Sequence, residues 1–153
     1  LDLFHLFFKG GVLYKAIGKF NNAYIDAILF FGMDAILDTN FILACLKRKI
    51  NFLDDLEAQG FKPILAHEVY EELKDVRRTA TLSDRVALDL ALALFEKRKV
   101  HKMTLGHHKV DDGLIAKGKK GAYIATLDAG IRRVVPQSIG ISNAQNTLEI
   151  TRQ

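Results

Sequence analysis

Short apolar runs that alternate with helix-like segments most constrain the fold of this chain. Three of them are almost wholly apolar: AIL at 35–37, PILA at 63–66 and AYIAT at 122–126. Such runs are typical of strands covered on both faces, and each is followed by a stretch with helical spacing of its apolar residues. This alternation predicts an α/β fold, with a three-layer α/β/α architecture and a central, mostly parallel sheet of about five strands.

The other predicted elements follow from helical spacing, cap residues and helix breakers. Helices are predicted at 41–46, 51–58, 68–76, 111–119 and 128–133, and further strands at 100–105 and 139–141. Ser83 is the expected N-cap of one longer helix. The apolar residues that recur at helical spacing in that helix are Val86, Leu90, Leu94 and Phe95. Gly60 and Gly121 are expected to end the helices before them.

The composition indicates one globular domain. A chain of 153 residues, 49% of them hydrophobic and 26% charged, is long enough for an adequate core. Lys and Arg outnumber Asp and Glu by 22 to 18, and the resulting charge of +4 suits a polyanionic partner better than an acidic one. The single cysteine, Cys45, cannot form an intramolecular disulfide, so we expect a core residue in a reducing, cytoplasmic compartment.

Residues 1–32 are predicted to be an N-terminal extension of unknown role, ahead of a folded domain at 33–153. The extension is rich in Phe and Leu, but charged residues interrupt it, so no run approaches the roughly 20 apolar residues that span a bilayer. It also lacks the positive start and the small-residue end of a signal peptide. We therefore expect no membrane association. The apolar residues of the extension need cover, so we expect it to pack on the domain or on the partner in a homodimer.

Directly after the first apolar run, Asp38, Thr39 and Asn40 place an acid and two small polar residues at the carboxyl end of a strand. Ligand sites gather at that edge of open α/β sheets, because strands end there and helices begin with unpaired N–H groups. The alternative is that Asp38 or Asn40 only caps the next helix. Further acids at the same edge would favour a ligand-binding site over a simple helix cap.

Other acids do occupy comparable places. They are Glu72 with Glu68 and Glu71 as alternatives, then Asp111 and Asp112, and finally Asp128. Several carboxylates in one pocket repel each other unless a cation is present, and oxygen ligands without a thiolate indicate Mg²⁺ or Mn²⁺. The candidate ligands of such an ion are Asp38, Asp111, Asp112 and Asp128. Water bound to the ion can attack a phosphodiester, while Thr39, Asn40 and Thr126 would orient the acids.

Basic and aromatic residues give a weaker indication of RNA binding. Those assigned to RNA are Arg132, Arg133, Lys117 and Lys120, within a wider basic set of Lys97, Arg98, Lys99, Lys102 and Lys119. Such residues bind phosphates when they share a face, but charged helix ends are usually just solvated. His107 and His108 are open to proton transfer or RNA contact, with a solvated loop as the alternative. Tyr70 is a candidate for stacking on a base, whereas Tyr123 lies within a strand and is expected in the core.

Four segments in order, AILDTN, VYEELKDV, VDDGLIA and AYIATLDAGIRR, carry a family resemblance over roughly residues 33–142. In this order and context they resemble the PIN-domain ribonucleases, most closely the small archaeal branch similar to the eukaryotic small-subunit processing nuclease. The resemblance implies a PIN-like fold and a metal-dependent ribonuclease whose acidic set is Asp38, Glu72, Asp111 and Asp128. Asp112 stays open as the third ligand. Relatives often carry a second acid shortly after the last Asp, where this chain has Ala129 and Gly130, so a second metal position also stays open.

Two functional hypotheses follow from different classes. The first is a metal-dependent ribonuclease, in ribosomal RNA processing or as a toxin-type enzyme that an antitoxin occludes. The second is a noncatalytic RNA-binding or ribosome-assembly factor that retains the fold. A phosphoacceptor receiver domain on a similar sheet fits less well, because that chemistry needs further acids, and the run at 63–66 ends in Ala66 and His67.

Overall fold

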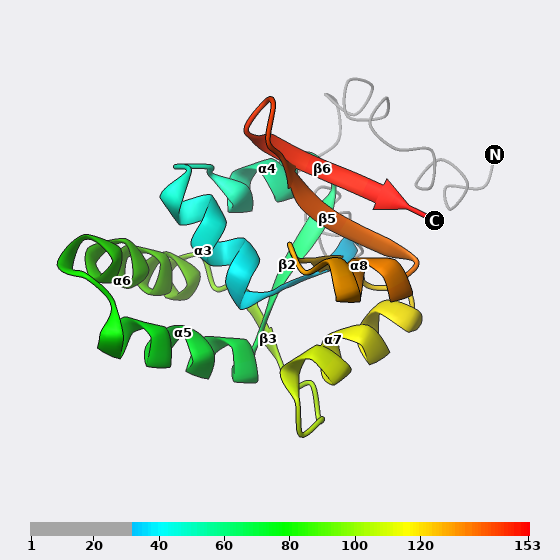
Figure 1. Cartoon of the computed structure of the whole chain (residues 1–153), viewed down its shortest axis with the longest axis horizontal. Helices are drawn as coiled ribbons and strands as arrows, with labels where there is room; N and C mark the ends of the chain where they lie inside the picture. Colours follow the sequence, from blue (N-terminus) through cyan, green and yellow to red (C-terminus); the bar gives the residue numbers. More distant parts are fainter. Residues whose placement is uncertain (1–31) are drawn as a thin grey trace, which may run out of the picture.

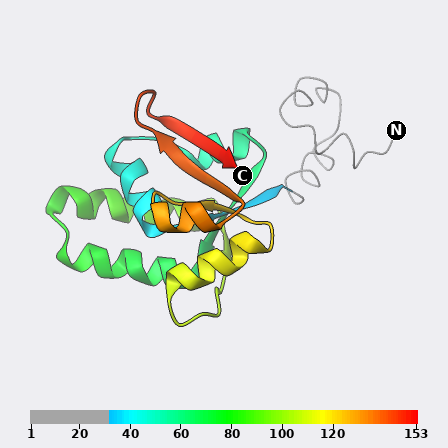
Figure 2. The same cartoon turned by 45° about the vertical axis from the view of Figure 1, so that its right-hand side comes forward.

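The computed structural model of the protein describes residues 32–153, so the predicted extension, apart from Gly32, lies outside the described residues. Its strands are β1 (Met33–Leu37), β2 (Phe61–Ala66), β3 (His101–Met103), β4 (Tyr123–Ala125), β5 (Gln137–Ser142) and β6 (Thr147–Arg152). Its helices are α3 (Thr39–Lys47), α4 (Phe52–Ala58), α5 (His67–Thr79), α6 (Leu82–Lys97), α7 (Val110–Lys119) and α8 (Ala129–Val134). Figures 1 and 2 show this arrangement from two directions.

The strands form one six-stranded sheet in the order β3-β2-β1-β4-β5-β6. Strands β1 to β5 pair in parallel, and β6 pairs antiparallel with β5. The predicted α/β class is thus confirmed, and the mostly parallel sheet with its helices is compatible with a three-layer architecture. From β1 the chain builds the sheet first through β2 and β3, and then on the other side through β4 and β5. The strand order therefore reverses between β1 and β4, which is where open α/β sheets usually bind ligands.

The central strands are apolar because both of their faces are covered. Residues Ala35 to Leu37 of β1 are at most 1% exposed, and all of β4 is buried. In the register of the sheet, Leu37 lies opposite Leu65 of β2 and Ala125 of β4. Three neighbouring strands therefore end almost level with one another. The residues that follow them, beginning with Asp38, meet at one edge.

Aromatic side chains fill much of the core. Phe52 lies edge-on to both Phe41 and Phe95, with ring centroids 6.0 and 6.1 Å apart. The ring of Tyr123 packs against Phe61 at 4.8 Å, so its predicted place in the core is confirmed. Cys45 is fully buried, and this burial raises the pKa of its thiol to about 12. The cysteine therefore stays protonated as a small core residue, as predicted.

Helix α6 differs from its prediction in two ways. Its N-cap is Thr81 and not Ser83, since the hydroxyl of Thr81 accepts a hydrogen bond of 3.2 Å from the N–H of Asp84. Three of the four apolar residues expected to mark its buried face are exposed, namely Val86, Leu90 and Leu94. The buried residues of α6 are instead Leu88, Ala91 and Phe95. Because apolar residues occur all around this helix, their spacing alone does not identify the face that packs.

The C-terminal strand β6 was not predicted. Its burial alternates irregularly from residue to residue, and it forms a hairpin with β5 at the edge of the sheet. An edge strand of this kind lacks the continuous apolar run that marks β1 and β4. The predicted helix ends at Gly60 and Gly121 are confirmed, with φ angles of +85° and +110°. In the described part of the chain, no helix has the length and apolar character needed to cross a membrane.

Candidate active site

Asp38 lies at the carboxyl end of β1, at the point where the strand order reverses. Its backbone N–H donates to the carbonyl of Ala125 at 2.9 Å, which continues the parallel ladder beyond the last residue of β1. One carboxyl oxygen accepts from the N–H of Thr39 at 2.8 Å, and the other accepts from the hydroxyl of Thr126 at 2.6 Å. Asp38 is only 6% exposed. The residue is therefore a helix cap and a buried carboxylate at once, and the two readings of the sequence do not exclude each other.

Glu72 reaches the same edge from the second turn of α5. Its carboxylate accepts a hydrogen bond from the hydroxyl of Thr39 at 2.5 Å, so Thr39 contacts Asp38 through its N–H and Glu72 through its side chain. The two alternatives on α5 are engaged elsewhere. Glu68 accepts from the N–H groups of Leu105 and Gly106, and Glu71 pairs with Lys74 at 2.8 Å. Among the three glutamates, Glu72 is thus the one that is linked to Asp38, through hydrogen bonds from Thr39 to both.

Asp111 is the third acid near Asp38. Burial raises the pKa of Asp38, the hydrogen bonds from Thr126 and Thr39 oppose this rise, and the negative charges of Asp111 and Glu72 add to it. Asp112, next to Asp111 in the first turn of α7, contributes less to this shift than Asp111 does. Asp111 is therefore the better supported of the two candidates. The raised pKa of Asp38 thus reflects its burial first, and the negative charges of Asp111 and Glu72 add to it.

Asp128 lies at the same edge but has a different role. Its carboxyl oxygen Oδ1 accepts from the N–H groups of Gly130 and Ile131 at 2.7 and 3.0 Å, which makes it the N-cap of α8. Its own N–H donates to the hydroxyl oxygen of Thr126 at 3.1 Å. Because that hydroxyl donates to Asp38, Thr126 links the two aspartates. One oxygen of Asp128 is therefore committed to the helix.

Asn40 holds the β4 side of the site in place. Its side-chain oxygen accepts from the N–H of Leu127 at 3.1 Å and lies 3.4 Å from the hydroxyl of Thr126. Thr39, Asn40 and Thr126 were predicted to orient the acids. All three take part in one hydrogen-bond network that joins the start of α3 to the end of β4 and to α5. Their side chains fix the positions of Asp38 and Glu72.

The donor set at this edge fits a hard divalent cation. Carboxylate, hydroxyl and amide oxygens surround Asp38, and no thiolate is near, since Cys45 is buried in the core. Within residues 32–153, however, no group of three or more His, Cys, Asp and Glu side chains is close enough together to hold an ion as it stands. Mg²⁺ usually keeps several of its waters, so such an ion would need few direct ligands from the protein. The chemistry of the site fits the ion, but the ligand set is not preformed.

The lysines predicted to bind RNA lie at the amino ends of the parallel strands, opposite the carboxyl ends where the acids lie. Lys117 and Lys120 end α7 just before β4 begins, whereas the acids follow the ends of parallel strands. Along the helix, Lys120 is about 13 Å from Asp111, at 1.5 Å per residue. The basic group Lys97 to Lys99 likewise precedes β3, and its Arg98 pairs with Asp54 and Glu57. These cations and the acids therefore do not share a pocket.

The two arginines of α8 also make other contacts. A terminal nitrogen of Arg132 lies 3.4 Å from the hydroxyl of Thr151, and the guanidinium covers Gly140 of β5. Arg133 is exposed and its Nε donates to the carbonyl of Ala129 at 3.1 Å. Arg132 is therefore engaged with the β5–β6 hairpin. Only Arg133 presents a guanidinium that is largely free for a phosphate.

The loop between β3 and α7 offers a cation, Lys109, to which the sequence analysis gave no role. It begins at the carboxyl end of β3 and leads into Asp111, and its His108 and Lys109 are exposed. His107 is also exposed, but a ring nitrogen lies 3.0 Å from the carbonyl of Leu105, so the ring is turned toward its own loop. The signal that could have identified Lys109 was its place directly before a helix that opens with two acids. Tyr70, a candidate for base stacking, instead has the ammonium groups of Lys74 and Lys102 at 5.0 and 5.6 Å from its ring centre.

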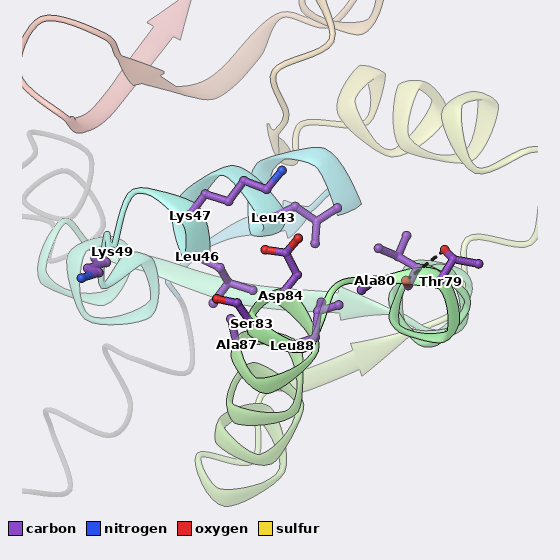
Figure 3. Close-up of a pocket in the computed structure, with 11 residues that line it drawn as sticks. Leu43, Leu46, Lys47, Lys49, Thr79, Ala80, Ser83, Asp84, Ala87 and Leu88 are labelled. Atoms are coloured by element: carbon purple, nitrogen blue, oxygen red, sulfur yellow. Dashed lines mark hydrogen bonds between the residues drawn. The ribbon is translucent and has the colours of Figure 1, made fainter.

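A hollow of about 420 Å³ lies away from the acids, between α3 and the start of α6. Figure 3 shows Leu43 and Leu46 from α3 on one side and Ala87 and Leu88 from α6 on the other. None of the predicted site residues lines this hollow. The candidate active site is thus separate from this hollow.

Comparison of the chain with protein-family models and with curated proteins found no match. The resemblance to PIN-domain ribonucleases therefore rests on the four sequence segments alone.

Proposed function

We propose that the protein is a metal-dependent ribonuclease that hydrolyses RNA phosphodiester bonds at the edge defined by Asp38, Glu72 and Asp111. The observation that carries the proposal is the buried carboxylate of Asp38, whose pKa is raised by its burial and by the two neighbouring acids. The charges of Asp111 and Glu72 disfavour the ionisation of Asp38, so the charged form of these acids needs compensation. A divalent cation would provide that compensation. The order of the four PIN-like segments points to the same activity.

Each residue at the edge has a separate task in this proposal. When bound, Mg²⁺ or Mn²⁺ supplies positive charge for the phosphate and an activated water. Asp38 and Asp111 would hold the ion, with Asp128 contributing its remaining oxygen. Glu72 would orient a bound water or accept its proton, and Thr39 would hold Glu72 in place through the hydrogen bond between their side chains. Thr126 and Asn40 would keep Asp38 in a single orientation.

RNA would approach the acids along the β3–α7 loop. Lys109 is exposed there, and its positive charge would offset the repulsion between the phosphates and the acidic edge, while the exposed His108 beside it could donate a hydrogen bond to a phosphate. Arg133 of α8 is a further candidate on the other side. The processing and toxin-type roles share this chemistry and differ in the partner, which would be a ribosome-assembly factor or an antitoxin.

The test is cleavage of a fluorescently labelled single-stranded RNA by the full chain in Mn²⁺, in Mg²⁺ and in EDTA. Cleavage that EDTA abolishes and that Asp38→Asn reduces by at least about a hundredfold is expected, since this substitution removes the central charge of the site. Asp112→Asn is the matched control, because it removes the neighbouring carboxylate, whose charge acts less on Asp38 than that of Asp111. Equal losses in the two variants, or cleavage that persists in EDTA, would refute the assignment.

A second candidate function is a noncatalytic RNA-binding or ribosome-assembly factor. The observation in its favour is that Asp128 caps α8 with Oδ1, so that the fourth acid of the predicted set already serves the fold. This candidate predicts RNA binding that neither EDTA nor Asp38→Asn affects, with no cleavage in any metal. The same assay, read together with a binding titration, separates the two.

A further inference from the structure

Glu68 is a carboxylate near the acidic edge to which the proposed function gives no task. It lies in the first turn of α5 and is half-buried. Ala66, the last residue of β2, lies opposite Met103, the last residue of β3, so the residues that follow these two strands meet at the same edge. Glu68 comes two residues after Ala66, and Leu105 comes two residues after Met103. The sheet thus brings Glu68 level with Leu105.

The carboxylate of Glu68 binds the backbone at the start of the β3–α7 loop. The N–H of Leu105 donates to both carboxyl oxygens at 3.1 Å, and the N–H of Gly106 donates to one of them at 3.4 Å. Successive backbone N–H groups that point at one anion form a concave anion site. Here a side chain of α5 fills that site, so the loop is tied to α5.

Leu105 extends this contact to α7. Its side chain is only 3% exposed and lies against the backbone of Gly113. A methyl group on Gly113 would come within 2.7 Å of the Cβ of Leu105, so the helix packs on this side chain without a gap. Asp111 lies two residues before Gly113 on the same helix, about 3 Å along its axis. Glu68 therefore acts on the position of Asp111 through Leu105 and the start of α7.

Glu72 lies on the same face of α5 as Glu68. Residues four apart on a helix are neighbours, with Cβ atoms about 5–6 Å apart. Glu72 accepts a hydrogen bond from Thr39, which also bonds to Asp38. One turn earlier, Glu68 holds the loop that leads to Asp111. Figures 1 and 2 both show the start of α5 beside the start of α7. One helix face thus contacts both parts of the acidic edge.

We propose that Glu68 is a positioning residue that sets Asp111 at the distance from Asp38 at which both can hold one divalent cation. The inference rests on the proposed function, which gives these acids a common ion. Glu68 itself would touch neither the ion nor the RNA. In the described part of the chain, no three such side chains are close enough to hold an ion as they stand. The cost of bringing Asp111 to the ion therefore depends on how firmly the start of α7 is held.

Glu68→Gln tests this role, because it keeps the size of the side chain and removes the charge that holds the loop. Calorimetric titration of the full chain with Mn²⁺ should give a dissociation constant about 10- to 100-fold above the wild-type value, as is usual when a group that orients a metal ligand is lost. Hydrogen exchange at the N–H of Leu105 should be faster in this variant. Since Asp111 is still present, a higher concentration of Mn²⁺ should restore most of the RNA cleavage. The same addition should not restore cleavage in Asp38→Asn.

Two variants are matched controls for charge and for stability. Glu71→Gln removes a neighbouring charge on α5 that pairs with Lys74 and not with the loop. Thr81→Ala removes the N-cap of α6 and so lowers stability beyond the opposite end of α5 from Glu68. Both controls should bind Mn²⁺ as tightly as the wild type does.

The possible outcomes separate this inference from the proposed function. Wild-type affinity for Mn²⁺ in Glu68→Gln, together with weakened binding in Asp38→Asn, would overturn the positioning role and leave the proposed function intact. An equal loss of affinity in Thr81→Ala would show a general effect of stability and would also overturn the role. A wild type that binds no Mn²⁺ would refute the proposed function, and the role of Glu68 with it.

Discussion

Thr126→Val is the substitution that tests the hydrogen-bond network of the acidic edge most sharply. Thr126 is fully buried, and its hydroxyl donates to Asp38 and accepts from the N–H of Asp128. Valine has almost the same shape, so the packing of the side chain should change little. Valine removes the hydroxyl that links Asp38 to Asp128. It therefore leaves a buried carboxylate oxygen of Asp38 without its hydrogen-bond donor.

The expected loss of stability follows from the two broken hydrogen bonds. A hydrogen bond to a buried charged group contributes about 1.5–3 kcal/mol, and the bond from the more exposed N–H of Asp128 adds about 0.5–1 kcal/mol. Together they predict that Thr126→Val lowers the free energy of unfolding by about 2–4 kcal/mol, a large part of the 5–15 kcal/mol typical of a domain. Thr126→Ser keeps the hydroxyl and loses one methyl group, which should cost only about 1 kcal/mol.

The loss should also depend on pH in a defined direction. The hydrogen bond from Thr126 opposes the rise that burial gives to the pKa of Asp38, so valine should raise that pKa further above its ordinary value of 3.8. A carboxyl group whose folded-state pKa is raised destabilises the fold once it is forced to ionise. The extra cost is therefore absent below the ordinary pKa, grows as the pH rises above it, and is complete above the folded-state pKa.

Urea unfolding followed by circular dichroism, for both variants and the wild type, measures these differences at acidic and neutral pH. The difference between valine and serine should be largest at neutral pH. Equal stability of the two variants at neutral pH would mean that the hydroxyl contributes nothing to the fold. A deficit of the valine variant that grows as the pH falls would show that the sign of the Asp38 effect is wrong.

Three further predictions concern the surroundings of the site. Glu68→Gln should destabilise the protein by about 1 kcal/mol at neutral pH, measured by urea unfolding, because the charged form of Glu68 bonds to backbone N–H groups of the β3–α7 loop. Burial raises the pKa of Glu68, but these hydrogen bonds outweigh it and lower the pKa below 4.5, so this contribution should vanish as the pH falls through that range. Gly118→Ala should lower the melting temperature despite alanine's better helix propensity of about 1 kcal/mol, since the new methyl would lie 2.6 Å from Val135, and overpacking costs about 1–3 kcal/mol. In a titration with labelled RNA, Lys109→Ala should weaken binding and reduce its salt dependence, whereas Lys120→Ala should change neither, and the reverse result would place the RNA at the opposite edge of the sheet.

The central part of the fold could be predicted from the sequence because its strands are buried on both faces. The runs that became β1, β2 and β4 contain little but apolar residues, and helical spacing follows each of them. The same reasoning failed where one face is exposed. Strand β6 lies at the edge of the sheet, and only the alternation of Leu148 and Ile150 with polar residues marks it, without a continuous apolar run. The spacing of apolar residues in α6 pointed to its outer face.

The acidic site was predictable in outline and not in detail. The rule that parallel strands end at a common edge brought Asp38 together with Glu72 and Asp111. The choice between neighbouring acids depended on which way each side chain points, and helical spacing alone does not determine that. The lysines predicted to bind RNA, such as Lys117, lie far from the acids for a physical reason. They are close to Asp111 in sequence, but a helix of ten residues carries them to the other edge of the sheet.

The most direct test of the account compares thermal melts of the wild type and Asp38→Asn at neutral pH, each in EDTA and in Mn²⁺. If Asp38 is the centre of a metal site, removing its charge relieves the cost of burying that charge and the repulsion from Asp111 and Glu72, so that the variant in EDTA should melt no lower than the wild type. Mn²⁺ at about a hundred times its dissociation constant should stabilise the wild type by about 2.7 kcal/mol, and this gain should shrink in Asp38→Asn but not in an Asp112→Asn control. An equal Mn²⁺-induced shift in the wild type and Asp38→Asn would contradict the metal site, and Asp38 would then be only a buried cap of α3.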